Sequence, residues 1–150
     1  DVMKGYWNAP ELTAEAIVNG YYRTGDLATI DDESYIYIVD RKKDMIISGG
    51  FNIYPAEIEQ VLYAHPDIYE AAAVGIPDEE WGEQIKAVVV LKPGHSASAQ
   101  HILDFCAQGL PGFKRPRSVD FTQELPKNPN GKIVRRLVRE PFWAGKERQV

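Results

Sequence analysis

The spacing of hydrophobic positions along the chain predicts three helices. The first begins at Pro55 and ends before Pro66, because proline suits the first turn of a helix and disfavours helix in the residue before it. Its apolar positions recur at helical spacing and are Ile58, Val61 and Leu62. The second follows a serine N-cap at Ser96 or Ser98. Its apolar face consists of Ala99, Ile102, Leu103, Cys106 and Leu110. The third is a short amphipathic helix over residues 133–140.

Runs of apolar and β-branched residues predict a small sheet beside these helices. Residues 45–50, 70–76 and 84–92 have the composition and length of strands. Residues 119–121 are a candidate for a further short strand. Strands and helices alternate, but the strands are few. We therefore expect a small α+β domain with a three-stranded sheet and about three helices.

The first forty residues have a different pattern, which is typical of a β-hairpin. The polar turn DDES at residues 31–34 separates two strand-like runs, over residues 20–30 and 35–39. A charged run, DRKKD at residues 40–44, then interrupts the pattern, and we interpret it as a linker or hinge. The chain starts with Asp1 rather than methionine, and we interpret it as a piece of a longer polypeptide.

The composition is that of an ordinary globular protein. The chain has 150 residues, of which 44% are hydrophobic and 26% charged, as expected for a domain with its own core. No apolar run approaches the about 18 residues of a membrane span. Cys106 is the single cysteine, which fits a reducing compartment. These features favour a cytoplasmic location.

Charge is distributed unevenly. Residues 112–139 carry eight basic and two acidic side chains, a net charge of +6, whereas the other residues sum to −11. A basic segment on an acidic body indicates an anionic partner, such as a phosphate group, nucleic acid or an acidic membrane. Peripheral contact with a membrane is therefore left open. The alternative is a solvated basic face without a partner.

Five motifs occur in order along the chain. They are YYRTGDLA (21–28), DRKKDMIISGGFNIYPAEIEQVL (40–62), EEWGE (79–83), GFKRPRSV (112–119) and PKNPNGKIVRR (126–136). Together they resemble the C-terminal part of an adenylate-forming enzyme, most like an acyl-CoA synthetase (fatty-acid–CoA ligase). The resemblance covers essentially residues 3–140.

The resemblance implies an activity and a division into parts. Such enzymes activate a carboxylic acid with ATP as an acyl-adenylate and then transfer the acyl group to the thiol of CoA. Residues 1–39 would be a remnant of the N-terminal domain, 40–44 a hinge, and 45–150 the mobile C-terminal domain. Mg²⁺ is expected with ATP, with its ligands outside this chain. We therefore expect this chain to need its own N-terminal domain as a partner and to be inactive alone.

The resemblance also assigns roles to residues near the nucleotide. Lys132, in the turn NPNGKI, matches the lysine that bridges the attacking carboxylate and the α-phosphate. An ammonium group suits this task because it relieves the repulsion between two anions. Asp26 matches an aspartate that binds the ribose hydroxyls, and Arg41 an arginine that contacts the nucleotide. In the expected hinge, Lys43 matches the pivot and Asp40 is the first residue.

A second group of residues is assigned to CoA. Its members are Gly49, Gly50, Trp81, Phe113, Arg115 and Arg117. The glycines would line the tunnel for pantetheine, since a residue without a side chain lets a ligand approach the backbone. The aromatic rings would clasp the adenine, and the arginines would meet the 3′-phosphate. Core aromatic residues beside a solvated basic loop are the alternative.

Other functions stay open on the sequence alone. The chain could be a non-catalytic CoA-binding or docking module, or an adenylation domain that passes its acyl group to a carrier protein. A nucleic-acid partner is not expected, because the motifs include no known reader element. The three histidines are dispersed along the sequence and lack metal-ligand spacing, so no metal site is expected. Cys106 is expected in the core.

Overall fold

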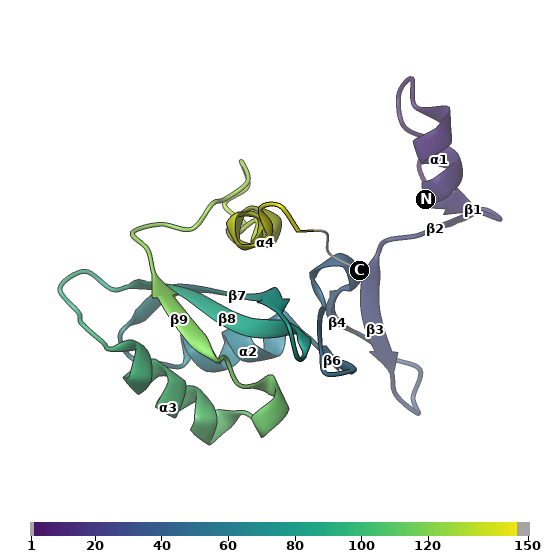
Figure 1. Cartoon of the computed structure of the whole chain (residues 1–150). Coiled ribbons are helices and arrows are strands. Elements are labelled where there is room, and N and C mark those ends of the chain that lie inside the picture. Colours follow the sequence, from purple (N-terminus) through teal and green to yellow (C-terminus); the bar gives the residue numbers. More distant parts are fainter. Residues whose placement is uncertain (1, 147–150) are drawn as a thin grey trace.

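A computed structural model of the chain describes residues 2–146. Its N-terminal part contains helix α1 (Pro10–Ala16), the short strand pair β1 (Ile17–Val18) and β2 (Tyr21–Tyr22), and a hairpin. Strands β3 (Asp26–Ile30) and β4 (Ile36–Arg41) pair antiparallel in this hairpin, which confirms the expected one. The carboxylate of Asp31 closes its turn by accepting the backbone N–H groups of Glu33 and Tyr35 at 3.0 and 2.9 Å. These elements extend to one side of the main body of the chain (Figure 1).

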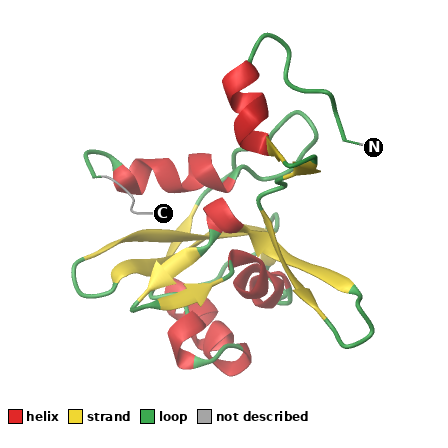
Figure 2. Cartoon of the chain, turned by 90° about the vertical axis from the view of Figure 1, so that its right-hand side faces the viewer, coloured by secondary structure: helices red, strands yellow, loops and turns green. Residues whose placement is uncertain are grey.

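The main body is a five-stranded sheet with helices on both faces (Figures 1 and 2). Its strands are β5 (Ile46–Ser48), β6 (Phe51–Ile53), β7 (Ile68–Asp78), β8 (Gly82–Leu91) and β9 (Ser118–Phe121). The order is β6-β5-β8-β7, and β9 pairs in parallel with β8. The helices are α2 (Pro55–Tyr63), α3 (Ala99–Gly109) and α4 (Arg135–Arg139). Three 3₁₀ turns complete the elements within residues 2–146: η1 (Lys42–Asp44), η2 (Gly112–Lys114) and η3 (Glu140–Trp143).

The α+β class is confirmed, but the sheet has five strands rather than the three expected. One extra strand arises because a second strand follows the two glycines that end β5. Gly49 and Gly50 both adopt positive φ values, of 56° and 81°, so the chain reverses there and residues 51–53 return as β6. The other extra strand is β9, which joins the sheet beside β8 after the α3 crossover.

The helices follow the predicted starting points closely. Helix α2 begins at Pro55, and Ser98 caps α3, where its hydroxyl oxygen accepts the backbone N–H of His101 at 3.1 Å. Helix α4 is shorter than the expected 133–140, because Ile133 forms a bridge with Lys127 instead of a helical turn. None of the helices within residues 2–146 is long and apolar enough to cross a membrane.

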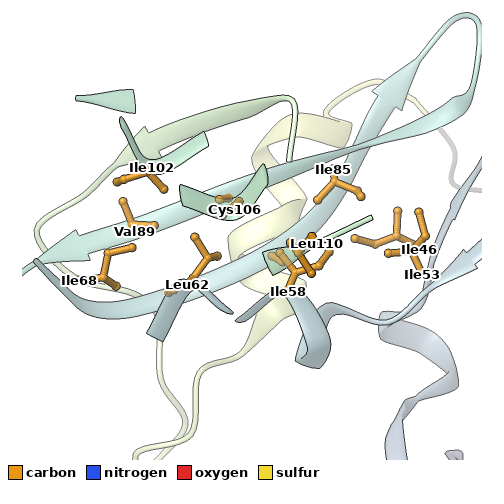
Figure 3. Close-up of a cluster of buried hydrophobic side chains, with 13 residues drawn as sticks. Ile46, Ile53, Ile58, Leu62, Ile68, Ile85, Val89, Ile102, Cys106 and Leu110 are labelled. Atoms are coloured by element: carbon orange, nitrogen blue, oxygen red, sulfur yellow. The ribbon is translucent and has the colours of Figure 1, made fainter. Parts of the chain in front are cut away.

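Two hydrophobic clusters hold the helices to the sheet. Between the sheet and helices α2 and α3 lie the residues drawn in Figure 3, including Ile58, Leu62, Ile85, Val89, Ile102 and Cys106. On the other face, the chain from Leu125 to α4 covers Ala72, Val74, Val88 and Val90. Because both faces are buried, β7 and β8 read as continuous apolar runs rather than as alternating ones. The prediction of Cys106 in the core is confirmed, and its burial raises the pKa of the thiol to about 11.

Candidate functional site

The expected hinge is more ordered than a charged linker. Asp40 and Arg41 end strand β4, and Lys42–Asp44 form the turn η1. Asp40 is buried, and its carboxylate accepts the backbone N–H of Ala56 at 2.9 Å, in the first turn of α2. The hinge sequence is therefore fastened to the main body through Asp40.

Asp26 and Arg41, the two residues expected near the nucleotide, lie together. They are cross-strand partners on β3 and β4, and Arg41 Nε is 3.5 Å from a carboxylate oxygen of Asp26. A hollow beside them is lined by Thr24, Gly25, Arg41, Lys42 and Lys43. Two lysines and an arginine around one hollow make a site suited to an anionic ligand.

Lys132 lies in a closed turn rather than in a loose loop. The side-chain oxygen of Asn128 accepts the backbone N–H groups of Asn130 and Lys132, at 3.0 and 2.9 Å. The backbone N–H of Asn128 donates to the carbonyl of Lys132 at 2.9 Å, and Gly131 adopts a φ of 77°. The asparagine and glycine of NPNGKI thus fix the backbone of the turn, while the side chain of Lys132 is exposed at its surface.

Arg135 is a residue that the sequence analysis missed. Its guanidinium forms a bidentate contact with Glu59, through Nε at 2.7 Å and Nη2 at 2.5 Å. Its Nη1 also lies 3.3 Å from Asp40 and 3.4 Å from Asp44. Hydrogen bonding to Glu59 raises the pKa of this guanidinium further above its already high value. The sequence does contain a signal for this position. Arg135 lies three residues before the apolar Val138, which is buried, and residues at this spacing share one face of a helix.

Residues assigned to CoA form two contact groups, one of Gly49, Trp81 and Arg117 and one of Phe113 with Phe51. The backbone N–H of Gly49 donates to the carbonyl of Trp81 at 2.9 Å. The guanidinium of Arg117 lies over the indole of Trp81, 5.3 Å from its centroid. Phe113 stacks on Phe51, with 4.9 Å between ring centroids. A contact of Phe51 with Phe113 was not predicted. The only hint in the sequence is that Phe51 directly follows Gly49 and Gly50, which were assigned to CoA.

The other residues assigned to CoA, and their neighbours, differ in their surroundings. Arg115 Nε donates to the carbonyl of Leu110 at 2.9 Å, so that this arginine supports the chain before η2. Gly50 faces open space in its turn. Lys114 forms an ion pair with Glu57 and lies 5.7 Å from the ring centroid of Phe113. Glu57 is therefore a partner of the basic loop as well as an acidic residue in the first turn of α2.

The histidines, dispersed in sequence, come together in space. Potential ligand atoms of His65, Asp67 and His101 lie within 4.8 Å of one another, and His95 Nδ1 is 2.7 Å from a carboxylate oxygen of Asp67. His65 Nδ1 accepts the backbone N–H of Asp67 at 3.2 Å, which leaves the proton on Nε2. A protonated ring nitrogen has no lone pair for a metal. The cluster therefore fastens the α2–β7 turn to the loop before α3.

The comparison with known proteins gives a consistent result. Residues 57–132, about half of the chain, match the family model of the AMP-binding enzyme C-terminal domain. The long-chain-fatty-acid–CoA ligase FadD13 of Mycobacterium tuberculosis is 49% identical over 95% of this chain and 28% of its own length. The fatty acid–[acyl-carrier-protein] ligase ScoC of Streptomyces coeruleorubidus is 45% identical over 99% of this chain and 28% of its own length.

Solved structures agree with these sequence matches. The crystal structure of ATP-bound MatB from Rhodopseudomonas palustris superposes with a TM-score of 0.84 at 39% identity, over 93% of this chain and 28% of that one. The chain thus spans little more than a quarter of the length of the relatives it matches. The match to the family model, together with this agreement in fold, shows that the chain belongs to the family of AMP-binding enzyme C-terminal domains.

Proposed function

We propose that this chain is the mobile C-terminal domain of an ATP-dependent acyl-CoA synthetase, an acid–thiol ligase. In the first half-reaction a carboxylate oxygen attacks the α-phosphorus of ATP, and pyrophosphate leaves. In the second, the thiol sulfur of CoA attacks the acyl carbon, its proton is lost to solvent, and AMP leaves. A fatty acid is the first candidate for the carboxylic acid, because FadD13 and ScoC both carry fatty-acid names.

The observation that carries this proposal is the contact group of Gly49, Trp81 and Arg117. Together with the stacked pair of Phe113 and Phe51, this group makes up the proposed CoA surface. Trp81 is 38% exposed and Phe113 46%, so their rings are accessible to a flat heterocycle such as adenine. Arg117 lies over the ring of Trp81 with a guanidinium suited to a phosphate. The indole of Trp81 covers Gly49, whereas Gly50 faces open space in the same turn, where a thin pantetheine chain could pass. CoA contains all three of these groups: adenine, a phosphate and a pantetheine chain.

Lys132 is proposed to act in the first half-reaction. Carboxylate and α-phosphate are both anions, and an ammonium placed between their oxygens lowers the energy of the approach. The closed turn around Asn128 holds the backbone of Lys132 while leaving its long side chain free to enter a neighbouring site. Asp26 is proposed to accept hydrogen bonds from the ribose hydroxyls, and Arg41 to contact the nucleotide beside it.

The hairpin supports the presence of a larger N-terminal domain. Ile30, Ile36 and Ile38 are each exposed by 67% or more, which is unusual for isoleucines of a strand pair. We propose that the missing N-terminal domain covers them and that the chain turns against it at the hinge 40–44, with Lys43 as the pivot. Mg²⁺ would enter with ATP, on ligands outside this chain. We propose a cytoplasmic location, where both ATP and CoA are available.

The proposal is tested on the longer protein that contains this chain by measuring the half-reactions separately. Lys132→Ala is expected to abolish ATP–pyrophosphate exchange and to spare thioester formation from supplied acyl-adenylate. Normal exchange in this variant would contradict the role of Lys132. Calorimetric titration with CoA and with CoA lacking its 3′-phosphate tests the second site. Equal binding of the two would contradict the role of Arg117.

A second candidate differs in the thiol that accepts the acyl group. The 45% identity to ScoC, named as a ligase for an acyl-carrier protein, favours a carrier-bound pantetheine as the alternative acceptor. Such an acceptor lacks the adenine and the 3′-phosphate of CoA. Thioester formation with a phosphopantetheinylated carrier protein but not with CoA would select this candidate. Binding of CoA without either half-reaction would indicate a non-catalytic module instead.

A further inference from the structure

We propose that Arg135 is a positioning residue that ties the turn carrying Lys132 to both sides of the pivot Lys43, and so fixes the position of that turn in the hinge conformation of this structure. This inference rests on the proposed function of Lys132 and adds a residue through which the hinge acts on it. Arg135 lies three positions after Lys132 and contacts the chain on both sides of Lys43.

The contacts of Arg135 join three elements that are distant in sequence. Its guanidinium reaches Asp40 at the end of β4, Asp44 at the end of η1 and Glu59 within α2. The side chains of these acids are 2%, 11% and 12% exposed, so the contacts are shielded from solvent. The Arg135 side chain is itself only 21% exposed. Its guanidinium resists displacement, because its loss would leave three largely buried carboxylates without a positive partner.

A second arginine, Arg139, contacts the hinge segment 40–44. It lies one helical turn after Arg135. Arg139 Nη1 lies 3.3 Å from the carbonyl oxygen of Lys43 and donates to it. Arg135 and Arg139 are four residues apart and therefore share one face of α4. That face bears on the hinge at Asp40, at the carbonyl of Lys43 and at Asp44.

Only two residues separate Lys132 from Arg135, and backbone contacts hold this segment against residues 126 and 127. The backbone N–H of Val134 donates to the carbonyl of Pro126 at 2.8 Å, and Lys127 pairs with Ile133 across the base of the turn. Few freely rotating bonds therefore separate the guanidinium from the backbone of Lys132. A change in the hinge is passed through Arg135 to the position of the catalytic ammonium.

Loss of the Arg135 contacts should affect adenylation, the first half-reaction, in particular. Adenylation requires Lys132 to be placed between two anions, and a displacement of about 1 Å can lower a rate about 100-fold. Thioester formation from supplied acyl-adenylate does not use Lys132. Loss of the Arg135 contacts should therefore lower the first half-reaction far more than the second, whereas a purely structural defect lowers both together.

The test uses Arg135→Lys in the longer protein, with Arg136→Lys as the matched control. Lysine keeps the charge but cannot make a bidentate contact and reach two further carboxylates. Arg136 is exposed and pairs with Glu140 at 3.5 Å. Arg135→Lys is expected to slow pyrophosphate exchange about 100-fold and to leave thioester formation near the parent rate. It should also speed hydrogen exchange in residues 40–44 and 128–135, and Arg136→Lys should change neither.

Two outcomes of this test contradict the inference. Equal losses in the two half-reactions would reduce Arg135 to a structural residue, and parent-like rates and exchange would remove its role altogether. If Arg135→Lys does not fold, Asp44→Asn removes one hinge contact and keeps the pair with Glu59, and it should give a smaller form of the same split. If the parent lacks pyrophosphate exchange, the proposed function fails, and hydrogen exchange alone decides whether Arg135 couples the hinge to the turn.

Discussion

Gly49 and Trp81 are in direct contact, and the contact leaves no room for a side chain on the glycine. A Cβ on Gly49 would lie 2.5 Å from Cε3 of the indole, and its φ of 56° lies in the left-handed region. Gly49 also donates its N–H to the carbonyl of Trp81. The hairpin β5–β6 thus sets the position of the ring that we propose to hold adenine.

Gly49→Ala is expected to destabilise the protein by about 1–3 kcal/mol, because it combines backbone strain with displacement of the indole. Gly50→Ala is the matched control, since Gly50 has a similar φ of 81° but faces open space. Urea unfolding of both variants measures the difference. The Gly49 variant should be the less stable of the two and should also lose CoA affinity. Equal stability would mean that Trp81 moves aside freely.

Asn128→Ala is expected to loosen the turn that carries Lys132. The variant loses the side-chain oxygen that accepts the N–H groups of Asn130 and Lys132, at about 1 kcal/mol for each hydrogen bond. Pyrophosphate exchange should fall several-fold without a comparable loss in thioester formation. Asn128→Asp keeps an accepting oxygen and should retain most of the exchange rate. Parent-like exchange in Asn128→Ala would show that the turn does not need this residue.

Variants of the aromatic and basic residues of the proposed CoA surface should differ in their effects on CoA and on dephospho-CoA, which is CoA without its 3′-phosphate. Trp81→Ala is expected to weaken CoA and dephospho-CoA alike, by about 1–3 kcal/mol, since stacking is indifferent to the phosphate. Arg117→Met should weaken CoA and leave dephospho-CoA nearly unchanged. Arg115→Met should have the smaller effect on CoA, because Arg115 Nε already binds the carbonyl of Leu110. Calorimetric titration of the three variants with both ligands measures these effects.

His65 should make the protein less stable in mild acid. Burial lowers the pKa of His65 below its usual value, so the unfolded state binds more protons than the folded state once the pH falls below about 6.5. Stability should therefore decrease from pH 8 to pH 5.5 and level off below the folded pKa. His65→Asn removes this titration and should flatten the dependence in urea unfolding, while His95 and His101 stay unchanged. An equally steep dependence in the variant would contradict the role of His65.

Much of the local structure was predictable because it depends on neighbours in sequence. Pro55 and Ser98 start helices through their own backbone and side-chain chemistry, and Asp31 closes its hairpin within five residues. The class of the fold followed from the alternation of these elements. The family resemblance rested on five ordered motifs, and the match over residues 57–132 confirms it.

The errors and omissions concern contacts between distant segments. The strand count was wrong because β6 returns beside β5 and because the candidate strand at 119–121 joins the sheet through a parallel pairing with β8. The grouping of three histidines around Asp67 was missed for the same reason. Sequence patterns give the faces of single elements, but they do not state which elements meet.

The amino-acid sequence by itself determined most of the elements, their class and the candidate residues, since these depend on local backbone preference and on motif order. The tertiary structure decided which candidates share a surface. Trp81 and Arg117 meet because β8 and β9 are neighbours, and Arg135 faces three acids because α4 packs across β7. The identity of a charged residue does not reveal which residue it will pair with in the fold. Burial between folded elements selects the partner, because an unpaired charge there is too unfavourable to persist.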